Sequence, residues 1–171
     1  TGYYLNYSID EIPIAGTKAS GVKGINLKDD TLVCGLTYKD TDEYLTIFTN
    51  KNTAKRIKIS ELNSLSRAKR GSTLIKKVKS TNYEIINAFI TNKNDNILLI
   101  NDEVITIKNT DIPIMDEVST GSNISKEKYK NVALSKELVI VSEEVIEMPK
   151  KIEDNEIKEM TIDDFINDFK L

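Results

Sequence analysis

Residues 54–62 read Ala54-Lys55-Arg56-Ile57-Lys58-Ile59-Ser60-Glu61-Leu62, and Gly71 follows them. The same pattern occurs about 50 residues earlier, at 4–14 with Gly21, and about 50 residues later, at 104–114 with Gly121. Each occurrence alternates apolar and polar side chains, which indicates a strand with one buried face. An acidic and an apolar residue come next, and the glycine closes a polar stretch. A pattern that recurs at a fixed period predicts an array of similar structural units.

Each repeat contains further strand-like segments. We predict them at 31–36 and 44–48 in the first repeat, at 84–90 and 96–100 in the second, and at 131–134 and 138–141 in the third. Ile, Val, Thr, Tyr and Phe, the types that suit a pleated surface, make up 59 of the 171 residues. The sequence therefore predicts an all-β fold of propeller-like blades, with repeats at 1–50, 51–101 and 102–141.

Charge is strongly segregated along the chain. Residues 51–80 contain ten basic residues and one acidic residue, a net charge of +9, whereas the whole chain has a net charge of −3. Isolated surface lysines are ordinary solvated groups, but nine uncompensated charges in thirty residues repel one another. A polyanionic partner explains that concentration better. The block has no aromatic residue for base stacking, so the expected partner is the phosphate backbone of duplex DNA.

The candidate phosphate contacts lie on the second repeat's strand and on the loops around Gly71 and Gly21. Arg56 and Lys58 alternate with isoleucines, and the residues around Gly71 add hydroxyls and backbone N–H groups that suit phosphates. The full set is Lys18, Lys23, Lys55, Arg56, Lys58, Arg67, Lys69, Arg70, Lys76 and Lys77.

Several kinds of site are not indicated. The chain has no histidine, which excludes a Ser-His-Asp triad and a histidine metal site, and its one cysteine, Cys34, excludes an internal disulfide. We assign no catalytic residue, no metal ligand and no cofactor site. No apolar run reaches membrane-spanning length. The chain begins with Thr1 and not with Met, so we expect it to be a piece of a longer protein.

Two stretches resemble the C-terminal domain of bacterial type IIA topoisomerase A subunits, which belong to DNA topoisomerase IV and DNA gyrase. Residues 13–34, with the run Gly21-Val22-Lys23-Gly24-Ile25-Asn26-Leu27, look like one blade of that domain. Residues 53–62 resemble its recurrent Lys-Arg strand. The resemblance covers residue 1 to about residue 141.

This resemblance implies a β-pinwheel whose blades exchange a strand and whose basic rim bends duplex DNA. The gyrase form carries a Gln-Arg-Arg-Gly-Gly-Lys-Gly box, which this chain lacks; its loop at 66–72 is a weak relative, and this favours topoisomerase IV. The implied partners are the ATPase B subunit, together with the rest of the A subunit. Mg²⁺ and ATP would be used elsewhere in the holoenzyme, in the bacterial cytoplasm at the nucleoid.

The alternatives are a gyrase wrapping domain and a blade-repeat scaffold that binds an acidic protein. The chain itself is expected to be monomeric and non-catalytic. Residues 142–171 carry ten acidic residues and four lysines. We predict an acidic linker at 142–160 and an amphipathic helix at 161–171. That end either packs on its own domain or competes with DNA for the basic block.

Overall fold

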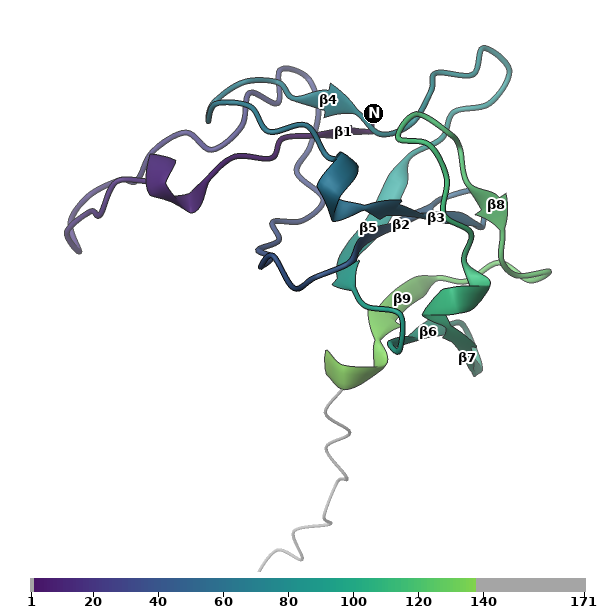
Figure 1. The fold of residues 1–171 in the computed structure, drawn as a ribbon. Coiled ribbons are helices and arrows are strands. Elements are labelled where there is room, and N and C mark those ends of the chain that lie inside the picture. The colour runs from purple at the N-terminus through teal and green to yellow at the C-terminus, as the bar shows by residue number, and fades with distance from the viewer. Residues whose placement is uncertain (1, 138–171) are drawn as a thin grey trace, which may run out of the picture. The chain divides into compact units, whose positions relative to one another are not determined.

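The computed structural model describes residues 2–137, and these form antiparallel β-sheets joined by loops and single turns of 3-10 helix (Figure 1). The strands are β1 (Tyr3–Tyr4), β2 (Tyr44–Thr49), β3 (Thr53–Lys58), β4 (Ser72–Thr73), β5 (Ile85–Thr91), β6 (Asn96–Ile100), β7 (Val104–Lys108), β8 (Ser122–Asn123) and β9 (Asn131–Leu134). The 3-10 turns are η1 (Ile9–Glu11), η2 (Ile59–Glu61), η3 (Asn109–Asp111) and η4 (Ser135–Glu137). The all-β prediction is confirmed.

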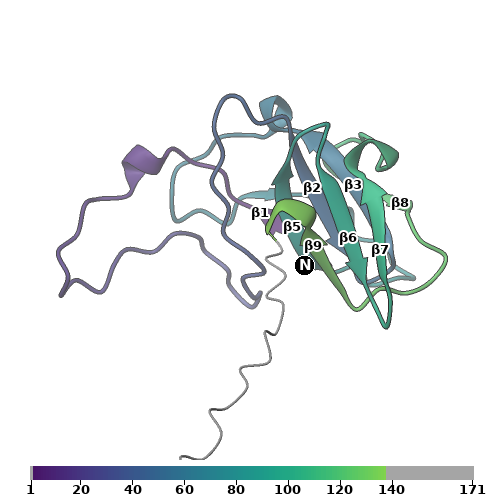
Figure 2. The same cartoon turned by 90° about the horizontal axis from the view of Figure 1, so that it is seen from below.

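Three sheets are present, with strand orders β1-β4, β5-β2-β3-β8 and β7-β6-β9 (Figure 2). Each sheet takes strands from more than one sequence repeat. The four-stranded sheet combines β2 from the first repeat, β3 and β5 from the second and β8 from the third. A blade in space is therefore assembled from successive repeats, and no repeat folds as a closed unit.

The predicted strands at 44–48, 96–100 and 131–134 form within a residue of their expected bounds. The expected strand at 31–36 is wrong, because that segment has no regular secondary structure. In the first repeat the expected alternating strand is also short: β1 ends at Tyr4, and only an isolated bridge at Asn6 follows. A strand needs a neighbour for its N–H and C=O groups, and among residues 2–137 no strand equivalent to β2 or β6 precedes β1.

Two apolar clusters form the core. One is centred on Phe48, whose ring meets Phe89 and Tyr129 edge to face at centroid distances of 6.0 and 6.4 Å. The other packs Ile47 and Ile57 of the central strands against Leu74 and Ile75, which follow β4. The second cluster therefore holds the loop after Gly71 against the four-stranded sheet. The predictions for residues 138–171, including the 138–141 strand, the acidic linker and the terminal helix, lie outside the described residues.

Candidate nucleic-acid interface

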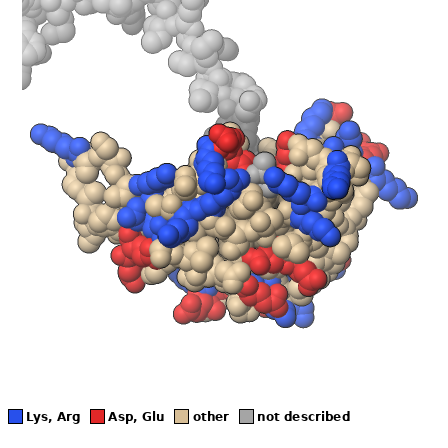
Figure 3. All heavy atoms as spheres, turned by 90° about the horizontal axis from the view of Figure 1, so that it is seen from above, with Lys and Arg blue, Asp and Glu red and all other residues tan. Residues whose placement is uncertain are grey.

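The exposed cations gather on the face that carries the glycine segments, by which we mean residues 12–23, 62–73 and 112–123. Figure 3 shows Lys and Arg side chains in a band across this face, with Asp and Glu mostly below the band and some above it. The β1–β4 pairing brings the 62–73 segment against the start of the chain, with Tyr4 opposite Ser72. Cations from two repeats thereby come to share one surface.

Arg67 fastens the 62–73 segment to the first repeat. Its guanidinium donates to the carbonyl oxygens of Glu11 at 3.0 Å and Lys23 at 2.6 Å, and its backbone N–H donates to the Glu11 carboxylate at 2.7 Å. The neighbouring backbone adds a bond from the Asn26 N–H to the Lys69 carbonyl at 2.8 Å. Lys23 and Lys69 therefore lie on adjoining loops, while much of the guanidinium's donor capacity is used within the protein.

Arg70 is oriented by an aromatic ring that sequence reasoning did not single out. Its guanidinium carbon lies 4.3 Å from the ring centroid of Tyr3, a cation–π contact that leaves the in-plane N–H donors at its edge. The sequence offers one indication of this contact. Tyr3 lies at the start of the first repeated strand, fifty residues before Thr53, which occupies the equivalent position in the second repeat. Tyr3 is thus a positioning residue for Arg70.

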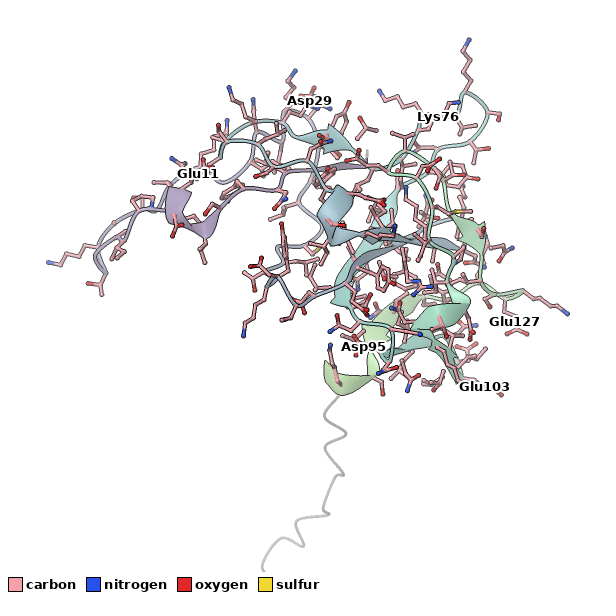
Figure 4. All side chains as sticks on the ribbon, in the orientation of Figure 1. Glu11, Asp29, Lys76, Asp95, Glu103 and Glu127 are labelled. Atoms are coloured by element: carbon pink, nitrogen blue, oxygen red, sulfur yellow. The ribbon has the colours of Figure 1, made fainter. Side chains whose placement is uncertain are left out.

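The remaining cations of this loop are open to solvent. Lys69, Lys76, Lys77 and Lys79 are all exposed, and Figure 4 shows Lys76 at the start of the loop that follows Leu74 and Ile75. The backbone N–H of Lys76 donates to the Val118 carbonyl at 2.7 Å, which fixes the base of that loop. Within residues 2–137, Lys58 is the one cation of the 51–80 block that takes part in an ion pair, with Glu61 at 3.1 Å.

Lys18 and Lys23 in the first repeat are exposed as well. The ammonium of Lys23 donates to the side-chain oxygen of Asn26 at 3.1 Å. That weak, neutral contact leaves its charge available. Together with the second-repeat loop these two lysines extend the cationic surface toward the start of the chain.

Lys55 does not fit the predicted role, because it is fully buried. Its ammonium donates to the carbonyl oxygens of Leu74 at 2.8 Å, Asp116 at 2.9 Å and Glu117 at 2.6 Å. All three donors are used, so none is left for a phosphate. Lys55 instead joins β3 to the third glycine segment and to Leu74, which directly follows the second.

The prediction that Arg56 contacts phosphate is also wrong, because this residue is only 7% exposed. Its guanidinium lies 4.7 Å from the ring centroid of Tyr44, and its Nε donates to the Ile112 carbonyl at 2.6 Å. Both faces of β3 are covered, one by the core and the other by the third repeat. The inward–outward alternation on which the phosphate assignment depended therefore does not hold for this strand.

Burial lowers the pKa of Lys55 to about 8 from 10.5, although the carboxylates of Glu117 and Asp116 oppose that shift. Above pH 8 the unfolded chain thus holds more protons than the folded one, and we expect the free energy of unfolding to rise with pH, by at most about 1.4 kcal/mol per pH unit. Above pH 10 the trend reverses, since burial raises the pKa values of Tyr4 and Tyr129 to about 12.

Urea unfolding of the wild type and of Lys55→Met between pH 8 and pH 10 tests this expectation. The wild-type free energy of unfolding should climb across this interval, and that of the variant should not. Equal slopes in the two proteins would contradict it. The test compares how steeply the free energy of unfolding changes with pH in each protein, so a lower overall stability of the variant does not affect the conclusion.

The third glycine segment is acidic where the second is basic. Asp116 and Glu117 occupy the positions of Ser66 and Arg67. The Tyr4 hydroxyl donates to the Glu117 carboxylate and accepts from the Asn63 N–H at 2.9 Å. These acids serve contacts between repeats, and the cationic surface ends at the third repeat. Among residues 2–137 no cluster of His, Cys, Asp or Glu could hold a metal ion, and no helix is suited to cross a bilayer.

Comparison with known families gives one match in two pieces. The family described as "DNA gyrase C-terminal domain, beta-propeller" matches residues 1–33 and 43–92. The first piece includes the repeated strand and glycine of the first repeat, and the second piece begins at the end of the first repeat and includes the strand and glycine of the second. The gap between them, residues 34–42, contains the second half of the 31–36 segment that forms no strand.

Comparison with curated proteins points to topoisomerase IV. The A subunit of DNA topoisomerase 4 from Streptococcus pneumoniae is 33% identical over 142 residues, which cover 72% of this chain and 17% of that protein. The protein of the same name from Bacillus subtilis is 35% identical over 88 residues, 52% of this chain and 11% of that protein. The chain spans less than a fifth of the length of these relatives.

Solved structures agree on the fold. The C-terminal domain of DNA topoisomerase IV superimposes with a TM-score of 0.71 and 31% identity, over 78% of this chain and 43% of that domain. The DNA gyrase A C-terminal domain superimposes with a TM-score of 0.61 and 19% identity, over 78% of this chain and 47% of that domain.

Proposed function

The chain belongs, through residues 1–33 and 43–92, to the family of DNA gyrase C-terminal β-propeller domains, and from this premise we propose that it binds and bends duplex DNA as an accessory domain of a topoisomerase IV A subunit. The names of its relatives and the absent gyrase box support topoisomerase IV over gyrase. The parent enzyme would act in the cytoplasm at the nucleoid, and its partner would be an ATPase B subunit.

One observation carries the proposal: the exposed cations of the 62–80 region adjoin those of the first repeat on one face. We assign phosphate contacts to the exposed members of the predicted set, Lys18, Lys23, Lys58, Lys69, Lys76 and Lys77, together with Arg70. Arg67 contributes mainly by fixing the two loops side by side. Lys55 and Arg56 are removed from the set because of their burial.

The surface suits backbone contact and not base readout. Within residues 2–137 it has no α-helix for the major groove, and the ring of Tyr3 is covered by Arg70. DNA binding by such a surface depends on counterion release and on how easily the duplex bends. We therefore expect little sequence preference and strong dependence on salt.

Fluorescence anisotropy with a labelled random duplex measures this dependence directly. About six neutralised phosphates predict that log affinity falls against log salt with a slope near −5. A slope near zero would contradict phosphate binding. Equal affinity for an acidic protein of matched charge would favour the scaffold alternative instead.

A further inference from the structure

The second repeat has a longer loop after its glycine than the third repeat has. β2 and β6 are equivalent strands, and each pairs on one side with a repeated strand and on the other with β5 or β9. In that register Ile90 of β5 and Leu134 of β9 hold the same place. Ile90 lies 19 residues after Gly71, whereas Leu134 lies 13 residues after Gly121. The second repeat thus has six additional residues before this place, and they lengthen the loop at 76–84.

Both ends of the 76–84 loop are held by the four-stranded sheet. The loop follows Leu74 and Ile75, which are buried in the core. At its other end the Glu84 carbonyl accepts from the Asn50 N–H at 3.0 Å, and the Glu84 N–H donates to the side-chain oxygen of Asn50 at 3.1 Å. The loop therefore projects from a base that is fixed on both sides.

Between these ends the chain makes one tight turn, at 78–81. The Thr81 N–H donates to the Val78 carbonyl at 3.3 Å, and the same two residues form an antiparallel bridge. Lys79 and Ser80 occupy the tip of the turn and are exposed. In Figure 1 this loop, in teal, extends away from β5. The projecting part is thus two chain segments wide, like a short β-ribbon.

The loop is cationic, with no acidic residue before Glu84. Lys76, Lys77 and Lys79 are exposed, and none of them takes part in an ion pair among residues 2–137. The major groove of a duplex is about 12 Å wide and admits a two-stranded ribbon, whereas the minor groove is about 6 Å wide. The width and the charge of the loop therefore suit the major groove.

We propose that the 76–84 loop enters the major groove of the duplex bound on the cationic surface. Lys79 and Ser80 at the tip then meet the base edges. Lys76 and Lys77, nearer the sheet, contact phosphates beside the groove. The inference rests on the proposed DNA binding, and it adds one groove contact to the backbone contacts of the surface.

Such a contact selects sequence only weakly, because one lysine and one hydroxyl can pair with several base edges. Its effect is to fix which side of the double helix faces the protein. Insertions confined to one repeat commonly carry a binding function on their face of a repeat protein. The additional six residues would thereby set the direction in which the bound duplex bends.

Disulfide trapping distinguishes the two grooves. Ser80→Cys places a thiol at the tip of the loop without changing the charge of the protein. One duplex carries a short tethered disulfide on N4 of a cytosine, in the major groove, and a second carries it on N2 of a guanine, in the minor groove. The introduced thiol attacks the tethered disulfide, joins the protein to the DNA and releases the outer thiol of the tether.

Two proteins serve as controls. Ser66→Cys is matched, because Ser66 is also an exposed serine and lies on the cationic surface outside the 76–84 loop. The wild type measures the background from its own Cys34. Fluorescence anisotropy with both duplexes confirms that each protein binds DNA with the same dependence on salt, and so is folded.

Trapping of Ser80→Cys should be at least about tenfold faster on the major-groove duplex than on the minor-groove duplex, because the loop raises the local concentration of the thiol there. The wild type and Ser66→Cys should show no such difference. Equal trapping of Ser80→Cys in both grooves, or faster trapping in the minor groove, would overturn the inference, as would the same preference in Ser66→Cys. These results leave DNA binding intact in the anisotropy measurement, whereas absence of binding there would end the proposed function itself.

Discussion

Gly71→Ala is expected to unfold the domain at room temperature or bring it close to unfolding. Gly71 has a φ of +91°, and an added Cβ would lie 1.8 Å from the carbonyl oxygen of Tyr4, 2.6 Å from its carbonyl carbon and 3.1 Å from the Cα of Leu5. These are backbone atoms that cannot rotate away. Relief requires separating β1 from β4, which opens the joint between the first two repeats. We expect a loss of about 4 kcal/mol or more.

The repeat supplies its own controls. In Gly121→Ala the added Cβ would lie 2.8 Å from the Ala54 carbonyl oxygen, so we expect an intermediate loss in the free energy of unfolding. Gly21→Ala, at a φ of +78° with no described atom within 4 Å, should cost only the backbone strain of about 1 kcal/mol. Urea unfolding of the three variants and the wild type measures the order of these losses. An equal loss at all three positions would show that positive φ alone, and not strand approach, demands these glycines.

Neutralising four cations of the 69–77 stretch together should nearly abolish DNA binding. The variant replaces Lys69, Arg70, Lys76 and Lys77 with glutamine. If each contacts one phosphate, the salt slope becomes shallower by about 3 to 4, and affinity falls by about a thousandfold at 0.1 M salt. None of the four makes an ion pair within residues 2–137, so the fold should be little affected, apart from the Arg70–Tyr3 contact.

A control with the same change in net charge separates local contact from general attraction. It replaces Lys93, Lys108, Lys130 and Lys136 with glutamine. All four are exposed. Lys136 is paired with Asp95 at 3.0 Å, and Figure 4 places Asp95 at the end of the domain opposite Lys76. This control should bind DNA nearly as the wild type does. Equal losses in the two variants would mean that the assigned face has no special role.

The strands that form as expected share one property. β2, β6 and β9 combine apolar and β-branched runs with turn residues at their ends, and β2 and β6 each have one partner strand nearby in the chain. β2 pairs with β3 across the turn at 50–52, and β6 pairs with β7 across the turn at 101–103. Local signals are sufficient there, because pairing partner and turn lie in the same short stretch.

The predictions that are wrong concern residues whose environment is set by segments distant in the sequence. Residues 31–36 have strand-like composition, and Cys34 packs beside Ala88 of β5, but none of their residues pairs with that strand in a described ladder, so they stay irregular. Lys55 looks like a phosphate ligand until the carbonyls of Leu74, Asp116 and Glu117 are placed around it. The one local sign that Lys55 is buried was its spacing of two residues from Ile57, which places both side chains on the same side of the strand. Arg56 follows the alternation and is buried all the same, since the third repeat covers the outer side of β3.

From its amino-acid order alone the chain is a repetitive β-protein with one concentrated positive block, because spacing, alternation and charge are local properties. Which lysines and arginines reach solvent was decided only when the repeats folded together, as was the division of each blade among successive repeats. The reason is that burial and hydrogen-bond partners come from segments many residues away, whose approach depends on a glycine and a carbonyl meeting in space.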